Sequence, residues 1–137
     1  GLASGMKSYF ESEAAEIGLR LVEPDGAPSL DAALQKGKPA TLDQVNNFVD
    51  GAAVARIGDL TFDVLRDLDR ASVLAAPEDR LCATIIEMLN VEGVVLEPAG
   101  ALSIDALSDL TYQIRGKRVV CVTSGGNFDF ERLPEVK

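Results

Sequence analysis

The segment Ser124-Gly125-Gly126-Asn127 places a hydroxyl, two glycines and an amide directly after the apolar run Val119–Val122. Such a run predicts a buried parallel strand, and open α/β sheets bind ligands at the carboxyl ends of their strands. The Ser124 hydroxyl could hydrogen-bond a ring nitrogen of a ligand, and the glycines would allow close backbone approach. A tight turn with Ser124 as a local cap explains the motif equally well.

Three other segments could contribute to a site. Gly1-Leu2-Ala3-Ser4-Gly5 precedes a predicted helix, so its backbone amides could hold a phosphate, although a flexible terminus has the same composition. Glu97 stands before Pro98, where a charge at a helix terminus is the simplest interpretation. Asp50-Gly51 is by itself a turn signal. None of the three defines a site alone.

Composition narrows the classes of partner. The chain has 137 residues, of which 47% are hydrophobic, enough for one modest domain with a core. Its 13 basic and 22 acidic residues give a net charge of -9, which disfavours nucleic acid and anionic membrane surfaces as partners. No window approaches the roughly 18 apolar residues of a membrane span, and the N-terminus lacks a signal-peptide pattern. We therefore expect a cytoplasmic protein.

Two catalytic chemistries are excluded for this chain alone. It contains no histidine, so a Ser-His or Cys-His nucleophile cannot be assembled from it. Its two cysteines, Cys82 and Cys121, lie in apolar patterns without metal-ligand spacing, so we expect neither a zinc site nor a disulfide.

Short strands and helices alternate along the chain, which predicts an α/β fold with a parallel sheet flanked by helices. Glycine and proline positions place the helices at about 4–15, 28–36, 59–68, 77–92 and 107–115. Strands are expected at 19–23, 71–75 and 119–122, and 38–55 is expected to be an irregular connection. For the third helix, Asp59 is the expected N-cap and Leu60 is expected on the apolar face.

Taken in order, these motifs resemble the second half of the catalytic large domain of the pyridoxal-phosphate-dependent threonine dehydratases, which have the tryptophan-synthase-beta-like fold. The resemblance covers essentially the whole chain, including Phe48–Gly51, Arg56–Asp59 and Arg132–Lys137. It implies that residues 1–137 are a partial catalytic domain. The region of the Schiff-base lysine, the small domain and any C-terminal regulatory domain would lie outside them.

The resemblance also implies a cofactor, pyridoxal phosphate, and residues that bind it. Gly1 and Leu2 match the end of the glycine loop that holds the phosphate in this family. Ser124 matches the serine beside the pyridine nitrogen, and a hydroxyl there leaves that nitrogen largely unprotonated. Gly51 and Glu97 match positions beside the cofactor ring.

A metal site is implied by the serine-racemase-like relatives, which bind a divalent cation through a glutamate, a backbone carbonyl and an aspartate. Glu23 and Ala27 are the matching positions here. Ser29 stands in place of the aspartate and is a poorer ligand for a hard cation.

No catalytic residue is expected within the chain. None of its lysines lies in the Ser-Phe-Lys-x-Arg-Gly-Ala context that forms the Schiff base in the family, so the isolated chain is predicted to be inactive. We expect all of them on the surface: Lys7, Lys36, Lys38, Lys117 and Lys137.

The function implied by the resemblance is that of a threonine ammonia-lyase, which deaminates L-threonine to 2-oxobutanoate and ammonia in isoleucine biosynthesis. Members of this family commonly form tetramers, so a homo-oligomer is expected. A serine dehydratase or serine racemase, acting on L-serine, fits the same motifs. An inactive fragment or a non-catalytic interaction module is the alternative from another class.

Overall fold

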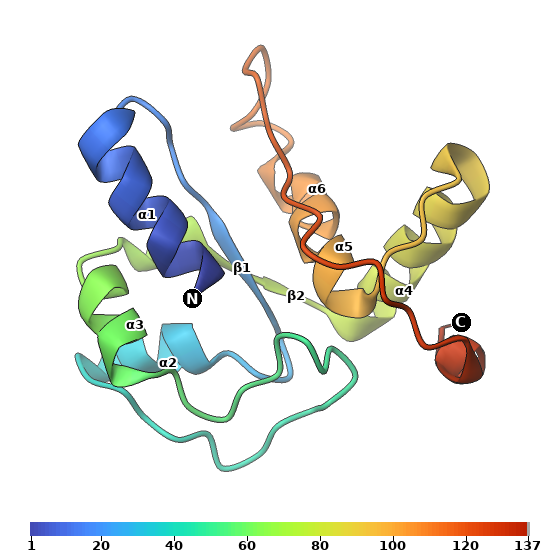
Figure 1. Cartoon of the computed structure of the whole chain (residues 1–137), viewed down its shortest axis with the longest axis horizontal. Helices are drawn as coiled ribbons and strands as arrows, with labels where there is room; N and C mark the ends of the chain where they lie inside the picture. The colour runs from blue at the N-terminus through green and yellow to red at the C-terminus, as the bar shows by residue number, and fades with distance from the viewer. Residues whose placement is uncertain (137) are drawn as a thin grey trace.

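Two parallel strands run through the middle of the molecule and separate two groups of helices (Figure 1). The computed structural model describes residues 1–136. The strands are β1 (Leu21–Pro24) and β2 (Val73–Ala76), paired in register from Leu21 with Val73 to Pro24 with Ala76. The helices are α1 (Leu2–Glu13), α2 (Ser29–Lys36), α3 (Asp59–Leu65), α4 (Glu78–Glu87), α5 (Pro98–Asp105) and α6 (Leu107–Leu110). Shorter helical turns are η1 (Arg70–Ser72), η2 (Met88–Glu92) and η3 (Phe130–Glu135).

The alternation of side chains along β1 creates two cores. Leu21 packs against a cluster formed mainly by α2 and α3, whereas Val22 packs against a cluster formed mainly by α4 and α5. Successive residues of a strand point to opposite faces, so the narrow sheet can bury apolar side chains on both sides. The α4–α5 cluster consists of Val49, Ala76, Leu81, Cys82, Ile85, Leu96, Ala101, Leu102 and Val136. The fold class expected from the sequence is confirmed, and none of the helices within residues 1–136 is long and apolar enough to cross a membrane.

Glycine ends the helices where the sequence predicts it. Gly37 follows α2 with a φ of 67°, and Gly93 follows η2 with the same φ. This left-handed conformation costs glycine little and other residues more, which explains why each helix stops there.

Two details of α3 differ from the prediction. Gly58 is the N-cap, and Asp59 is the first helical residue, where its carboxylate pairs with Arg56 at 2.6 Å. The apolar face also departs from the prediction at its first residue. Leu60 is 84% exposed, and Phe62 is buried instead.

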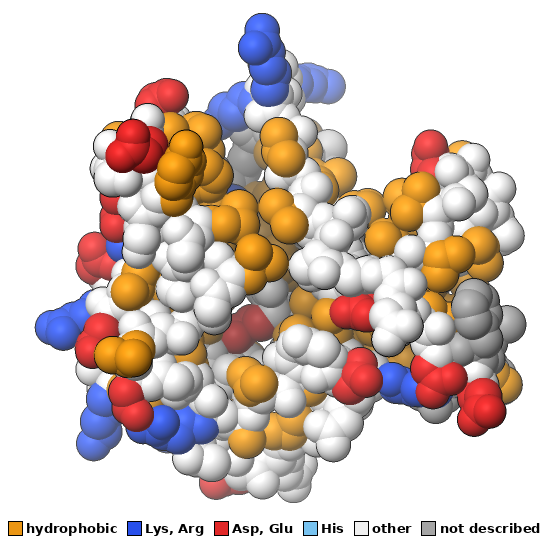
Figure 2. All heavy atoms as spheres, viewed as in Figure 1, with side chains coloured by type: hydrophobic (Ala, Val, Ile, Leu, Met, Phe, Trp, Pro, Cys, Tyr) orange, Lys and Arg blue, Asp and Glu red, His pale blue; other side chains and the backbone are white. Residues whose placement is uncertain are grey.

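The predicted strand at Val119–Val122 is also wrong. The segment is extended, but within residues 1–136 no strand lies beside it, and β1 and β2 pair only with each other. Val119, Val120 and Val122 are exposed, and Figure 2 shows hydrophobic side chains along this part of the surface. A strand needs a neighbour for its backbone hydrogen bonds, and an apolar run alone does not supply one.

Lys7 is not the surface residue that the sequence suggested. It is 8% exposed and joins two carboxylates, Glu11 at 2.5 Å and Asp67 at 2.9 Å. The hydrogen bond to Glu11 is the main reason why the pKa of Lys7 is raised above its ordinary value. Because Asp67 follows α3, the buried ammonium ties α1 to α3. Lys36, Lys38 and Lys117 are exposed as expected, and Lys137 lies outside the described residues.

A buried carboxylate joins α4 to α5. Arg80 donates through Nε and Nη2 to Asp105, at 3.0 and 2.7 Å, and the Thr84 hydroxyl donates to the same carboxylate at 3.0 Å. The guanidinium also donates to Asp109, at 2.8 and 2.6 Å. The hydrogen bond from Arg80 lowers the pKa of Asp109 below its ordinary value. This network fixes the orientation of α5, whose N-terminus forms part of the site described below.

Candidate functional site

Glu97, Gly51 and Gly125 come together from three separate parts of the chain. Glu97 is the N-cap of α5, and its carboxylate lies so close to Gly125 that a Cβ there would overlap it. A Cβ on Gly51 would lie 3.3 Å from the Glu97 Oε1 and 3.0 Å from the Cβ of Ala99. Two of the residues predicted for the site, Gly51 and Glu97, are therefore neighbours, and a side chain at Gly51 or Gly125 would crowd the carboxylate.

The backbone that follows Ser124 is anchored on the first turn of α5. The Glu97 amide donates to the Gly125 carbonyl at 3.2 Å, and a Cβ on Gly100 would overlap that carbonyl. Ser124 itself is exposed, and within residues 1–136 its hydroxyl makes no hydrogen bond. A hydroxyl of this kind can donate to, or accept from, a polar atom of a ligand.

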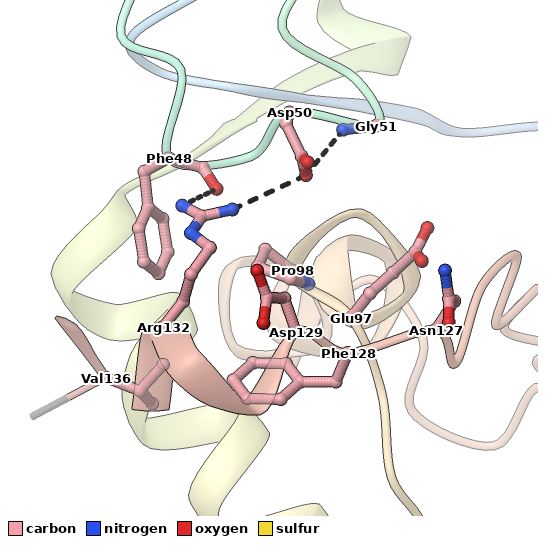
Figure 3. Close-up of a pocket in the computed structure, with 10 residues that line it drawn as sticks. All are labelled: Phe48, Asp50, Gly51, Glu97, Pro98, Asn127, Phe128, Asp129, Arg132 and Val136. Carbon is pink, nitrogen blue, oxygen red and sulfur yellow. Dashed lines mark hydrogen bonds and ion pairs between the residues drawn. The ribbon is translucent and has the colours of Figure 1, made fainter. Parts of the chain in front are cut away.

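A cavity of about 140 Å³ opens beside this cluster, and Figure 3 shows the side chains around it. Glu97 and Asn127 line one part of it, and Phe48, Asp50 and Arg132 line another. The polar groups that line it include the Glu97 carboxylate and the Asn127 amide, and Asn127 follows Ser124 by only three residues. This arrangement can bind a compact polar group in contact with the backbone at Gly51.

Gly1 and Leu2 lie apart from this cluster, at the start of α1. Gly1 is the N-cap, and no side chain caps the first turn of the helix. Within residues 1–136, no hydrogen bond or ion pair joins this turn to Gly51, Glu97 or Ser124. Exposed amides at a helix N-terminus suit an anion, but the structure does not show these two residues at the Glu97 cluster.

Comparison with known proteins decides the family. The model of the family "Pyridoxal-phosphate dependent enzyme" matches residues 1–125, which include every segment of the Glu97 cluster. The chain belongs to this family.

Within this family, the chain is similar to threonine dehydratases. The biosynthetic L-threonine dehydratase IlvA of Bacillus subtilis (strain 168) is 44% identical over 137 residues, and that of Staphylococcus saprophyticus is 41% identical over 138 residues. Each alignment covers all of this chain but only 32% of the relative, so the chain spans about a third of the length of these curated relatives.

Solved structures give the same result. The processed form of threonine deaminase isoform 2 from Solanum lycopersicum superposes with a TM-score of 0.90 at 30% identity, covering 99% of this chain and 40% of that one. Maize serine racemase superposes with a TM-score of 0.81 at 29% identity, covering 98% of this chain and 42% of that one. The fold is therefore that of the pyridoxal-phosphate-dependent threonine deaminases and serine racemases.

The carboxylate of Glu23 caps a helix in this chain. Its two carboxylate oxygens accept from the amides of Leu30 and Asp31, each at 2.9 Å, and so cap the start of α2. The carbonyl of Ala27, the other predicted metal ligand, accepts from the Ser29 amide at 2.9 Å. Within residues 1–136 there is no group of three or more His, Cys, Asp or Glu residues that could hold a metal ion. Metal binding through Glu23 and Ala27 stays a prediction.

The Glu23 carboxyl should make stability depend on pH. Burial raises its pKa above the ordinary value, although the two backbone donors act in the opposite direction. A carboxyl whose pKa is raised on folding favours the folded state while it is protonated, and this contribution is lost as the pH rises through the raised pKa. We therefore expect the free energy of unfolding of the wild-type protein, relative to Glu23→Gln, to fall as the pH rises from the ordinary titration range of a glutamate carboxyl through this raised pKa.

Urea denaturation of both proteins across that range would measure the difference. Asp25→Asn is the matched control, because Asp25 is an exposed acid two residues further along the chain. A difference between wild type and Glu23→Gln that stays constant with pH would contradict the expectation.

Sequence reasoning missed two residues of the site, Gly100 and Arg132. Gly100 lies inside α5, where glycine costs about 1 kcal/mol relative to alanine, and this cost was a usable signal that something packs closely there. Arg132 contacts Phe48, 84 residues away in the sequence, and no local pattern reveals such a pairing.

Proposed function

We propose that this chain is part of a pyridoxal-phosphate-dependent threonine ammonia-lyase, which deaminates L-threonine to 2-oxobutanoate and ammonia. The observation that carries this proposal is the 44% identity with a biosynthetic L-threonine dehydratase along the entire chain, including the Glu97 cluster. In this proposal residues 1–137 belong to the catalytic large domain. The lysine that carries the cofactor and the small domain would be supplied by other parts of a longer protein.

The Glu97 cluster would receive the ring of the cofactor. Pyridoxal phosphate, when bound, supplies the electron sink for chemistry at the α-carbon of an amino acid. The free Ser124 hydroxyl would hydrogen-bond the pyridine nitrogen, and the backbone at Gly51 would border the ring. Gly125 and Gly51 lack the Cβ atoms that would overlap or crowd the Glu97 carboxylate, so this carboxylate can stay beside the ring. The glycine-lined cradle and the unpaired hydroxyl fit the cofactor.

The uncapped first turn of α1 would hold the phosphate. Gly1 and Leu2 would present backbone amides to it, and the positive end of the helix dipole would favour its charge.

The names of the relatives support a biosynthetic role. Both relatives described above are biosynthetic threonine dehydratases, so isoleucine biosynthesis is the pathway that we propose. The cytoplasm is the compartment and a homotetramer is the assembly that we propose. L-Serine is the alternative substrate, because maize serine racemase is also similar to this chain.

The proposal is tested with the full-length protein purified with pyridoxal phosphate. We expect visible absorbance from bound cofactor and release of 2-oxobutanoate from L-threonine, and we expect Ser124→Ala to lower kcat/KM about 10-fold through loss of one hydrogen bond. Ser8→Ala, which changes an exposed serine of α1, is the control.

Three results would decide against parts of the proposal. Absence of bound cofactor would refute it entirely. Bound cofactor with turnover of L-serine in place of L-threonine would transfer the assignment to a serine enzyme. A Ser124→Ala protein with the kinetics and absorption spectrum of Ser8→Ala would show that Ser124 does not contact the ring.

A further inference from the structure

Arg132 connects the C-terminal end of the chain to the turn that carries Gly51. It lies in η3, and its Nη2 donates to the Phe48 carbonyl at 3.0 Å. Its Nη1 lies 3.7 Å from the Oδ1 of Asp50, and its guanidinium carbon lies 5.6 Å from the centre of the Phe48 ring. Figure 3 shows the guanidinium between Phe48 and Asp50. The Arg132 side chain thus contacts Phe48 and Asp50, two of the three residues that precede Gly51 in this turn.

The contacts continue from Arg132 to the backbone of Gly51. The same Asp50 Oδ1 that faces Arg132 accepts a hydrogen bond from the Gly51 amide at 2.9 Å. The turn is closed from the other side by the buried Val49, whose carbonyl accepts from Ala52 and Ala53 at 2.9 and 2.8 Å. Asp50 is exposed, so without Arg132 its carboxylate has no charged partner holding it in this orientation within residues 1–136.

The segment that carries Arg132 begins at the other wall of the site. Ser124 and Gly125 stand a few residues before it, and Gly125 is fixed on α5 by the Glu97 amide. Beyond Arg132, Val136 is buried in the α4–α5 cluster. Residues 125–136 are therefore attached to the rest of the fold at both ends. This attachment fixes the position of the backbone that carries Arg132, whose side chain contacts the Phe48–Gly51 turn.

We infer that Arg132 is a positioning residue of the cofactor site, which clamps the Phe48–Gly51 turn against Glu97 and so sets the separation between the Gly51 backbone and the Ser124 hydroxyl. The inference rests on the proposed function. Arg132 need not touch the cofactor, because it acts through Phe48 and Asp50. Arginine suits this task, since its planar fork can engage a carbonyl, a carboxylate and an aromatic face at once, whereas a lysine ammonium cannot.

The test compares Arg132→Met, Arg132→Lys and a matched control, Arg66→Met, in the full-length protein. Arg66 forms an exposed ion pair with Asp63, at 3.9 Å, and neither residue lines the cavity. We expect Arg132→Met to bind pyridoxal phosphate about 10-fold more weakly, the loss typical of one charged hydrogen bond, and Arg132→Lys to bind it with intermediate affinity. Arg66→Met should bind like the wild type.

A second measurement does not depend on the cofactor. Hydrogen exchange of the apo protein should be faster at the amides of residues 51–53 in Arg132→Met, with the exchange of α2 unchanged. A double-mutant cycle with Asp50→Asn should show non-additive effects on cofactor affinity, because both changes break one connection. If Arg132→Met fails to fold, the same cycle is built with Arg132→Lys in its place.

The outcomes separate the inference from the proposed function. If the wild-type protein binds no pyridoxal phosphate, the proposed function fails. If the wild type binds it and Arg132→Met binds it as tightly as Arg66→Met does, only the inference is overturned. Additive effects of Arg132→Lys and Asp50→Asn would likewise overturn it.

Discussion

Replacement of Gly100 by alanine should reduce the affinity for pyridoxal phosphate by about 100-fold, which corresponds to an overpacking cost of about 3 kcal/mol at the site. The new Cβ would overlap the carbonyl of Gly125, which belongs to the backbone and cannot turn aside as a side chain could. The Ser124 turn would have to move away from α5, and the hydrogen bond from the Glu97 amide to the Gly125 carbonyl would be lost. Titration of the apo protein with the cofactor, followed by absorbance and fluorescence, measures the effect.

Two other glycine substitutions serve as comparisons. Gly125→Ala places its Cβ against the Glu97 carboxylate, the end of a flexible side chain that can rotate away, so we expect a smaller loss of affinity. Gly18→Ala meets nothing within 4 Å and should leave the affinity unchanged. Equal affinities in Gly100→Ala and Gly18→Ala would show that the contact between α5 and the Ser124 turn does not shape the site.

Local signals in the sequence predicted the features that depend on a few neighbouring residues. The positions of β1 and β2 and the ends of α2 and η2 follow from apolar runs and from glycines that accept positive φ, such as Gly37. These rules fail where the outcome depends on distant residues. The apolar run Val119–Val122 has the composition of a buried strand, but it has no hydrogen-bonded neighbour within residues 1–136.

In the candidate site, too, contacts between residues distant in the sequence were not predictable from local signals. The proximity of Gly51 to Glu97 was expected only from the resemblance to a known family, since the turn signal at residues 50–51 and the helix start at Pro98 do not imply contact. Lys7 was placed on the surface because lysines usually lie there, but Asp67, 60 residues away, supplies part of the charge that makes burial tolerable. Arg132 could not be predicted at all, because its partner Phe48 lies 84 residues away in the sequence and only folding brings the two together.

The other large effect concerns stability. Asp105→Ala should lower the free energy of unfolding by about 3 kcal/mol, the scale expected when a buried acceptor of charged hydrogen bonds is removed and a cavity is left. The Asp105 side chain is 1% exposed and accepts hydrogen bonds from Arg80 and Thr84. Its removal leaves a cavity and takes from Arg80 the partner that holds α4 against α5. Urea denaturation followed by circular dichroism measures the change, and an unchanged slope would confirm that both proteins unfold in the same way.

Asp109→Ala is the matched comparison, because Asp109 pairs with the same guanidinium but 38% of its side chain is exposed. Solvent screens such a pair, so we expect a loss of about 1 kcal/mol or less. Arg80 lowers the pKa of Asp109, so this smaller contribution should be present at neutral pH and disappear as the pH falls through the lowered pKa. If Asp109→Ala destabilised the protein as much as Asp105→Ala, burial of the Asp105 carboxylate would not explain the contribution of this network to stability. The orientation of α5 would then depend on the exposed ion pair between Arg80 and Asp109.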